Sequence, residues 1–336
     1  MTAISKIAES TNNMNARKAC IVVPVHNEAE NIEEFVRAVQ EATQAIRGWD
    51  LSILFVEDGS TDSTFTVIEN CRSHASIPIG CLQFSKNFGH QAALEAGLLH
   101  ADGDAVISMD GDLQHPPSEI PRILEALERG VDVVQMVRDR PAGGHKGLLS
   151  RWFYAIFTRW SPVGIIPDAS DYRLITRRVI DVLAKIPERD KFLRGLLPTL
   201  GFKQECLLYR EGNRNAGVPS YTFIRSLKLA QKALFDFSLL PLRLVFALGL
   251  TLAFASFIGG VWHILNKLIR ADQVVPGFTD IIVAILFLSG CMLISIGVLG
   301  RYMMLILDQV RGRPPYVINT LLPPTSHAQS ARTDHP

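Results

Sequence analysis

Short apolar runs and amphipathic segments alternate along the chain as far as residue 137. Runs of consecutive apolar, often β-branched residues predict buried strands, whereas apolar residues spaced three or four apart predict helices. The predicted strands are 19–25, 51–56, 79–84, 105–109 and 131–137, and the predicted helices are 29–46, 63–71, 89–100 and 116–129. Because strands alternate with helices, we expect right-handed βαβ units and an α/β domain with a mostly parallel sheet.

Two much longer apolar runs follow in the C-terminal part of the chain. Residues 244–265 include no Asp, Glu, Lys or Arg, and residues 281–300 include no ionisable residue except Cys291. A helix of about 20 apolar residues can cross the bilayer core, so the two runs predict a two-helix transmembrane hairpin. The alternative is a pair of buried helices in a large soluble core, although such helices rarely run this long without a charge.

Charges beside the two runs predict which ends lie in the cytoplasm. Arg243 precedes the first run and Arg301 and Arg311 follow the second, whereas the segment between the runs carries as many acids as bases. By the positive-inside rule both termini lie in the cytoplasm. Residues 1–18 hold no apolar core of a signal peptide, so the domain before the hairpin is expected to stay cytosolic.

Two amphipathic segments near these runs predict contact with the membrane surface. Residues 151–160 place aromatic side chains on one helical stripe, and residues 220–237 place basic side chains opposite an apolar face. Such helices are typical of the bilayer interface; the alternative is that both segments pack against the sheet. The stretch from Pro314 onward is rich in Pro, Ser and Thr, which predicts disorder.

Acidic residues follow three of the predicted parallel strands. They are Glu28 after the first strand, Glu57 and Asp58 after the second, and Asp110 and Asp112 after the fourth. Ligands of open α/β sheets bind at the carboxyl ends of the strands, so we expect these side chains at one shared site. Many carboxylates together need a cation or hydrogen-bond donors. Two acids separated by one glycine suit Mg²⁺ or Mn²⁺, with a diphosphate completing the coordination.

Composition and missing motifs argue against several other classes of protein. The 34 basic and 33 acidic residues give a net charge of +1, without the basic excess typical of nucleic-acid binding. No Gly-x-Gly-x-x-Gly follows the first strand and no P-loop motif is present, which argues against dinucleotide binding and P-loop NTPase activity. The five cysteines form no C-x-x-C pair, so neither a disulfide framework nor a zinc cluster is expected.

A series of segments resembles the motifs of glycosyltransferase family 2, which has the GT-A fold: VVPVHNEAENI, FVEDGSTDST, SKNFGHQAALEAGL and VISMDGDLQHPP. Later segments, together with the two apolar runs, are similar to the polyprenyl-phosphate branch of that family: DYRLITRRVID, ERDKFLRGLLPTLGF and REGNRNAGVPSY. The resemblance covers residues 19–315. It implies an inverting, Mg²⁺- or Mn²⁺-dependent transfer of a sugar from a nucleotide sugar, expected to be UDP-linked, to a polyprenyl phosphate such as undecaprenyl phosphate.

The resemblance also implies an organisation of the chain and a set of partners. The expected parts are a mobile N-terminus (1–18), a cytosolic GT-A catalytic domain (19–219), a basic amphipathic juxtamembrane helix (220–241), two transmembrane helices (242–303) and a partly disordered cytosolic tail (304–336). The expected partners are the nucleotide-sugar donor, the lipid phosphate and the membrane, with no nucleic acid. The expected location is the bacterial inner (cytoplasmic) membrane. The sugar, the prenyl chain length and the choice between a monomer and a homo-oligomer are left open.

Residue roles follow from the positions that match the family. The nucleotide is expected to contact Pro24, Asn27, Glu28, Asp58, Lys86 and Asp110. A Mg²⁺ or Mn²⁺ ion is expected on Asp110, Asp112 and Gln114. The expected catalytic residues are Asp112, Asp171 and Arg138, with Asp171 either a base or an orienting group. The expected ligands of the acceptor phosphate are Arg138, Arg140, Arg173, Arg210 and Arg214, with Arg173 either a phosphate ligand or the partner of Asp171.

Two rival functions share part of this pattern. A processive polysaccharide synthase would have the same acidic edge, but it should carry Gln-x-x-Arg-Trp, and here Ile156 precedes Arg159 and Trp160 in place of the glutamine. A non-catalytic membrane scaffold of the same fold is expected to have lost an acid at Asp110 or Asp112, and both are present.

Overall fold

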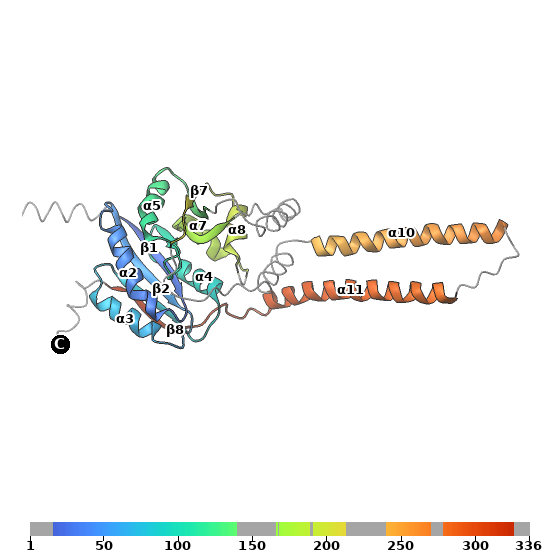
Figure 1. Ribbon diagram of the computed structural model, residues 1–336, viewed down its shortest axis with the longest axis horizontal. Coiled ribbons are helices and arrows are strands. Elements are labelled where there is room, and N and C mark those ends of the chain that lie inside the picture. Colours follow the sequence, from blue (N-terminus) through green and yellow to red (C-terminus); the bar gives the residue numbers. More distant parts are fainter. Residues whose placement is uncertain are drawn as a thin grey trace, which may run out of the picture. The chain divides into compact units, whose positions relative to one another are not determined.

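The computed structural model of the protein describes residues 16–139, 166, 168–188, 191–212, 240–269 and 278–325. It divides into two compact units, which are described separately (Figure 1). The first unit contains the described residues up to 212 and those from Pro314 onward, and the second contains two long helices.

An eight-stranded sheet forms the centre of the first unit, with the order β7-β5-β6-β4-β1-β2-β3-β8. The strands are β1 (Arg17–Val25), β2 (Trp49–Glu57), β3 (Ile79–Phe84), β4 (Ala105–Ser108), β5 (Val133–Arg138), β6 (Ala169–Thr176), β7 (Gln204–Tyr209) and β8 (Ile318–Thr325). β1 is parallel to β2 and β4, β2 to β3, and β5 to β7. β6 is antiparallel to β4 and β5, and β8 is antiparallel to β3. The predicted mostly parallel α/β sheet is confirmed.

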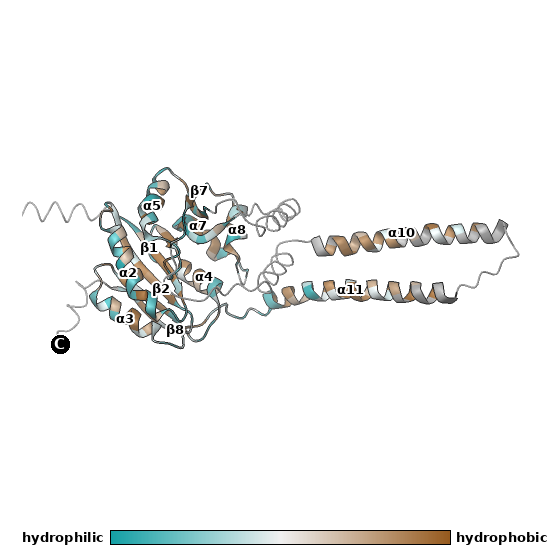
Figure 2. Ribbon diagram, in the orientation of Figure 1, coloured by the Kyte–Doolittle hydropathy of each residue, from teal (hydrophilic) through white to brown (hydrophobic). Residues whose placement is uncertain are grey.

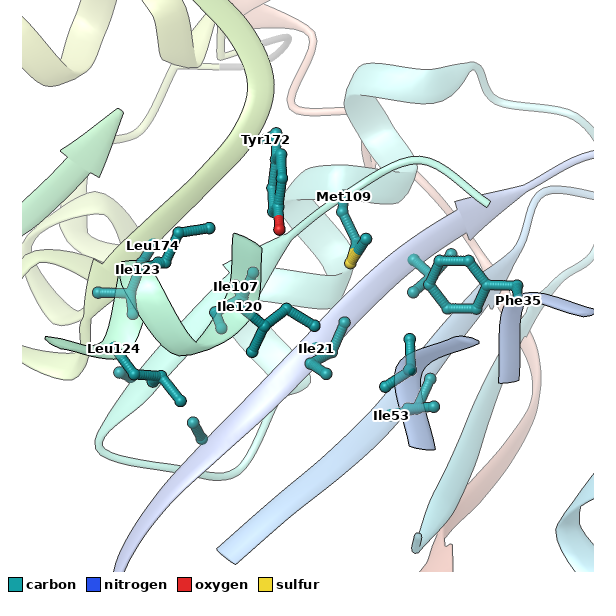
Figure 3. Close-up of a cluster of buried hydrophobic side chains, with 14 of the residues drawn as sticks. Ile21, Phe35, Ile53, Ile107, Met109, Ile120, Ile123, Leu124, Tyr172 and Leu174 are labelled. Carbon is teal, nitrogen blue, oxygen red and sulfur yellow. The ribbon is translucent and has the colours of Figure 1, made fainter. Parts of the chain in front are cut away.

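Helices cover both faces of this sheet. They are α2 (Ala29–Thr43), α3 (Thr64–His74), α4 (His90–His100), the short 3-10 helix η2 (Pro117–Glu119), α5 (Ile120–Glu128), α7 (Arg177–Lys185) and α8 (Leu193–Thr199). Side chains of β1 alternate between two cores. Ile21 lies in one core with Phe35 of α2 and Ile123 of α5 (Figure 3). Val22 lies in the other core with Leu94 of α4. Because both faces are buried, the strands read as continuous apolar runs in the sequence.

The five strands and four helices predicted up to residue 137 are present, with ends shifted by a few residues. The prediction of disorder from Pro314 onward is wrong for Ile318–Thr325, which forms the edge strand β8. Two prolines, Pro323 and Pro324, lie in this strand, and an edge position tolerates them because a missing N–H removes no central ladder bond. Leu322 packs against the core, whereas Leu321 is exposed. The partner strand is more than 200 residues away in the chain, so no local pattern reveals the pairing.

The second unit contains the helices α10 (Leu240–Ile269, 30 residues) and α11 (Phe278–Val310, 33 residues), which contact each other. Apolar residues are spread over both helices (Figure 2), and many of the described ones are exposed. Within the described part of the chain, one stretch, Phe287–Val310, is long and apolar enough to cross a membrane, and none of it is buried. The two-helix transmembrane hairpin stays a prediction. The amphipathic segments 151–160 and 220–237 lie outside the described residues.

Candidate active site

The loops after β1 and β2 are joined by hydrogen bonds between backbone and side chains. Asn27 has a positive φ of 53°, and its backbone N–H donates to Ser60 Oγ at 3.0 Å. Its side-chain Oδ1 accepts from the Thr61 N–H at 2.8 Å, and the Glu28 N–H donates to Thr64 Oγ1 at 3.0 Å. Pro24 lies in register with Val56 of β2. The structure therefore places Pro24, Asn27 and Glu28 together at the carboxyl edge of the sheet.

Asp58 fastens a third loop, which follows β3, to this edge. Its Oδ1 accepts from the Phe88 N–H at 2.6 Å and its Oδ2 from the Gly89 N–H at 2.9 Å. Burial raises the pKa of the Asp58 carboxyl, and the two hydrogen bonds oppose that rise. Beside it, Gly59 has a φ of +62°, and a Cβ there would lie 2.2 Å from the carbonyl carbon of Lys86. The loop after β2 thus packs backbone against backbone on Ser85–His90. The exposed Lys86 places Nζ 5.1 Å from the Phe88 ring.

The Asp110-Gly111-Asp112 loop follows β4 and faces Glu28. A Cβ on Gly111 would lie 2.9 Å from Glu28 Oε2, so the missing side chain leaves room for that carboxylate. The Gln114 N–H donates to Asp112 Oδ1 at 3.1 Å, which tightens the turn. Three of the five carboxylates predicted to share the edge, those of Glu28, Asp110 and Asp112, are brought to the same loop cluster.

His115 stabilises this loop through a hydrogen bond to its backbone, a role that the sequence analysis missed. It has no exposed surface, and its Nδ1 accepts from the Asp110 N–H at 2.9 Å. Burial lowers the pKa of the His115 imidazole, which therefore stays neutral with its proton on Nε2. The ring stacks on Tyr172, with centroids 5.1 Å apart, and the Tyr172 hydroxyl donates to the Pro116 carbonyl at 3.1 Å. His115 thus holds the backbone of the acidic loop.

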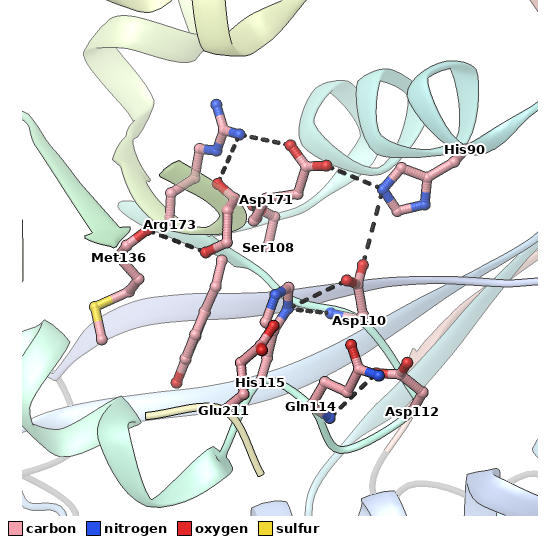
Figure 4. A network of polar contacts seen from close by, with 12 residues as sticks. His90, Ser108, Asp110, Asp112, Gln114, His115, Met136, Asp171, Arg173 and Glu211 are labelled. Atoms are coloured by element: carbon pink, nitrogen blue, oxygen red, sulfur yellow. Dashed lines mark hydrogen bonds and ion pairs between the residues drawn. The ribbon is translucent and has the colours of Figure 1, made fainter. Parts of the chain in front are cut away.

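Asp171, on β6, is the centre of a buried network of charges (Figure 4). Its Oδ1 accepts from Arg173 at 2.6 Å, and its Oδ2 accepts from Arg194 of α8 at 2.6 Å. His90 places Nε2 3.4 Å from Asp171 Oδ2 and 3.8 Å from Asp110 Oδ1, so it bridges the two carboxylates. The network joins the β6 acid to the acidic loop after β4.

These neighbours decide the ionisation of the network. Burial alone would raise the pKa of Asp171, but His90, Arg173 and Arg194 hold it well below its usual range. Asp171 is therefore an ionised carboxylate that is poorly suited to take up a proton. Burial lowers the pKa of the half-exposed His90 imidazole, but the hydrogen bond to Asp171 and the charge of Asp110 outweigh it and raise that pKa overall.

The arginines predicted to bind the acceptor phosphate differ in how much of each side chain is exposed. Arg173 has 1% of its side chain exposed, and burial lowers its pKa to about 10; its guanidinium lies behind Asp171 and has no surface for an acceptor phosphate. Arg138 has 26% exposed, and its Nε lies 2.9 Å from Glu211 Oε1 and 3.3 Å from the Tyr209 hydroxyl. Arg210 is exposed, and its Nε lies 3.6 Å from Asp139 Oδ2. Arg140 and Arg214 lie outside the described residues.

The sequence analysis also missed two members of the network, His90 and Arg194. Each lies in a segment that carried the family resemblance: His90 directly after Lys86–Gly89, and Arg194 within ERDKFLRGLLPTLGF. About a third of the Arg194 side chain is exposed, so it is the network's guanidinium that a ligand can reach. Their positions within these motifs could have marked both residues as candidates for the site. The direction of each side chain, however, depends on how α4, β6 and α8 pack.

The described residues do not by themselves form a complete metal site. Among the described residues, no group of three or more His, Cys, Asp or Glu side chains is arranged to hold a metal ion. Asp110 Oδ1 is nevertheless a buried oxygen that accepts no hydrogen bond within the described part of the chain, with His90 at 3.8 Å. A carboxylate oxygen of this kind fits a hard divalent cation that takes its other ligands from water and phosphate.

The profile of "Glycosyl transferase family 2" matches residues 20–181, which contain all the acidic loops. The chain is 38% identical to the "SfII prophage-derived bactoprenol glucosyl transferase" of Shigella flexneri, over 90% of this chain and 97% of that protein. It is 37% identical to the "Prophage bactoprenol glucosyl transferase homolog" of Escherichia coli (strain K12), over 90% and 98%. The chain therefore belongs to glycosyltransferase family 2, and the predicted enzyme class is confirmed.

Solved structures add little to this assignment. A "Mannosyltransferase PcManGT from Pyrobaculum calidifontis in complex with GDP-Man and Mn2+" aligns with 64% of this chain and 61% of its own, at 19% identity and a TM-score of 0.46. A match this distant carries no conclusion about the ligands of this chain.

Proposed function

We propose that the protein transfers a sugar, with inversion, from a nucleotide sugar to the phosphate of a polyprenyl carrier, and that a divalent cation assists the reaction. The observation that carries this proposal is the meeting of Asp110, His90, Asp171 and Arg194 at the carboxyl edge of the sheet. It puts an acidic loop suited to a metal and a diphosphate beside a guanidinium suited to a second phosphate. The names of the relatives above support a polyprenyl phosphate as acceptor and glucose as the first sugar to test.

The two halves of this site are termed the donor side and the acceptor side. The donor side consists of the loops after β1, β2, β3 and β4, with Asn27, Glu28, Asp58, Lys86 and the Asp110–Gln114 turn. The acceptor side consists of Asp171, Arg173 and Arg194 with the nearby Arg138. On the donor side, Asp110, Asp112 and Gln114 would hold Mg²⁺ or Mn²⁺. When bound, such an ion offsets the negative charge that develops on the leaving diphosphate.

On the acceptor side the chemistry needs charge compensation more than a strong base. A phosphate monoester has a second pKa of about 6, so an oxygen of the acceptor is already ionised near neutral pH. That oxygen forms the new bond to the anomeric carbon as the bond to the diphosphate oxygen breaks, and the electron pair leaves with the nucleoside diphosphate. Arg194 and Arg138 would screen the two anions from each other. Asp171 would orient Arg194 and His90 and take no proton, which favours the orienting role over the base.

A lipid acceptor also requires a membrane location. We propose that α10 and α11 are the two spanning helices of an integral protein of the bacterial inner membrane, with the α/β unit and both termini in the cytoplasm. A cysteine introduced between residues 270 and 277 should then react in intact cells with a reagent that cannot cross the membrane, whereas a cysteine at residue 330 should not. The reverse labelling pattern would contradict this topology.

A donor screen tests the function directly. The purified full chain would be given radiolabelled UDP-glucose, UDP-galactose or GDP-mannose with undecaprenyl phosphate and Mg²⁺ or Mn²⁺, and label would be counted in the lipid extract. We expect one donor to label the lipid fraction. The Asp112→Asn variant should lose that label, and Asp102→Asn, a matched change at an exposed acid, should keep it. Label released only as free sugar, or transfer to a soluble alcohol without lipid phosphate, would reject the proposal.

A further inference from the structure

The chain returns to the α/β unit after α11 and touches the loop that precedes α4. We term residues 316–325 the return segment. Its strand β8 pairs with β3 in a register that sets Ile318 opposite Phe84, the last residue of β3. One step further, the Ser85 N–H donates to the Val317 carbonyl at 3.0 Å. The pairing therefore continues past the end of β3 into the loop Ser85–His90.

Aromatic side chains extend this contact towards the donor side. The half-buried ring of Tyr316 stacks on Phe84, with centroids 5.1 Å apart and an interplanar angle of 9°. Phe84 in turn meets Phe88 edge to face at 5.7 Å and 87°. Tyr316 also lies 6.1 Å from the ring of His100, at the far end of α4. Contacts among the rings of Tyr316, Phe84 and Phe88 thus connect the return segment with the middle of the loop Ser85–His90.

The opposite side of the same loop forms part of the site. Phe88 and Gly89 give their backbone N–H groups to Asp58, and the next residue, His90, contacts both Asp110 and Asp171. The loop is therefore held between the return segment and three acids of the site. Stacked and edge-to-face ring pairs add about 0.5–1.5 kcal/mol beyond the area that they bury, so the ring contacts stabilise Phe88, and the backbone that carries its N–H, in this position.

We propose that Tyr316 is a positioning residue of the donor side. Its ring, together with the Val317 carbonyl, keeps Ser85–His90 in the conformation that Asp58 and His90 require, so donor binding depends on a segment that lies beyond both apolar helices in the chain. The proposal rests on the proposed function only for the identity of the ligand. The alternative is that β8 merely covers a sheet edge that would otherwise pair with other chains, in which case Tyr316 affects stability alone.

The test uses the full chain and three substitutions of Tyr316. Tyr316→Ala removes the ring, Tyr316→Leu keeps apolar bulk without stacking, and Tyr316→Phe keeps the stacking ring. Leu321→Ala is the matched control, because Leu321 lies on the same strand with 53% of its surface exposed. Amide hydrogen exchange would be followed at Phe88 and Gly89, and the KM for UDP-glucose, the KM for undecaprenyl phosphate and kcat would be measured in parallel.

We expect Tyr316→Ala and Tyr316→Leu to speed exchange at Phe88 and Gly89 and to raise the donor KM roughly three- to tenfold, the range that loss of one aromatic pair gives. The KM for the lipid should stay unchanged, and Tyr316→Phe and Leu321→Ala should resemble the parent. Should the alanine variant fail to fold, the leucine variant decides.

Lower thermal stability with unchanged exchange and donor KM would overturn the positioning role. The exchange measurement needs no nucleotide. If no donor is used by the parent protein, the proposed function fails, while faster exchange at the two amides still supports the positioning role and unchanged exchange still rejects it.

Discussion

The donor side and the acceptor side are stabilised in different ways. On the donor side, backbone N–H groups of one loop donate to a side chain of the preceding loop, as in the contacts of Asn27 and Asp58. On the acceptor side, one carboxylate, Asp171, holds the guanidinium groups of Arg173 and Arg194 and the imidazole of His90. The donor side therefore has a shape fixed before any ligand binds. The acceptor side has charges that already neutralise one another, so the phosphate that we propose as acceptor would have to share Arg194 with Asp171.

The largest expected effect comes from the acidic loop that the two sides share. Asp112→Asn keeps the size of the side chain but removes a charge from the predicted metal site. We expect glycolipid formation to fall about 10²- to 10³-fold, because the charge on the leaving diphosphate is then poorly offset. The measurement is transfer of label to undecaprenyl phosphate at several Mg²⁺ and Mn²⁺ concentrations. Full activity of this variant, or full activity of the parent in excess EDTA, would remove the metal from the account.

A smaller effect should separate the acceptor side from the donor side. Arg194→Lys keeps the charge but loses the two-pronged guanidinium that reaches both oxygens of Asp171. We expect kcat/KM for the lipid phosphate to fall about tenfold while the dissociation constant of the nucleotide sugar stays the same. Arg178→Lys, at an arginine with 75% of its side chain exposed, is the matched control. Equal loss of donor and lipid binding would show that Arg194 acts on both sides, and it would contradict the division into a donor side and an acceptor side.

The tight fit between donor-side loops can be tested through stability. Gly59→Ala would place a Cβ against the backbone of Lys86 and would also strain a positive φ. We expect it to lower the free energy of unfolding by about 2 kcal/mol or more. Gly130→Ala is the matched control, because Gly130 has a φ of +76° but open space around its Cβ position, so only the strain of about 1 kcal/mol remains. Equal losses in the two variants would show that the loops are not closely packed.

A last effect concerns the pH dependence of the acceptor side. Because the pKa of Asp171 is lowered on folding, its ionisation stabilises the folded protein above the unfolded value of about 4, and that stabilisation is lost as pH falls towards the folded pKa. The thermal midpoint of Asp171→Asn should therefore lie below that of the parent at neutral pH. The gap should narrow in acid as the parent loses its advantage, whereas Asp102→Asn should show no such change. A gap that is constant down to acid pH would contradict the ionised state of Asp171.

The contrast between the two sides also explains what the sequence could reveal. Asp58, Asp110 and Asp112 follow strands with strong local patterns, and parallel strands bring their ends together, so the shared acidic edge could be predicted. His90 and Arg194 meet at Asp171, which lies on β6, the strand inserted antiparallel between β4 and β5. The pattern of apolar residues in the sequence does not indicate this strand order. Arg173 shows the same limit of sequence analysis. An arginine at this position could form a buried ion pair or bind a phosphate, and only the structure shows that it is buried against Asp171. β8 was missed because its partner, β3, is distant in the chain.

The central claim is that a phosphodiester forms between a sugar and a polyprenyl phosphate. Phosphorus NMR of the lipid extract measures this bond directly, with undecaprenyl phosphate and the donor identified by the screen. We predict that the monoester resonance of the lipid declines and that a phosphodiester resonance replaces it, in step with the nucleoside diphosphate released. A monoester resonance that persists while the nucleotide sugar is consumed would contradict the account, because the sugar would then have gone to water or to a hydroxyl group.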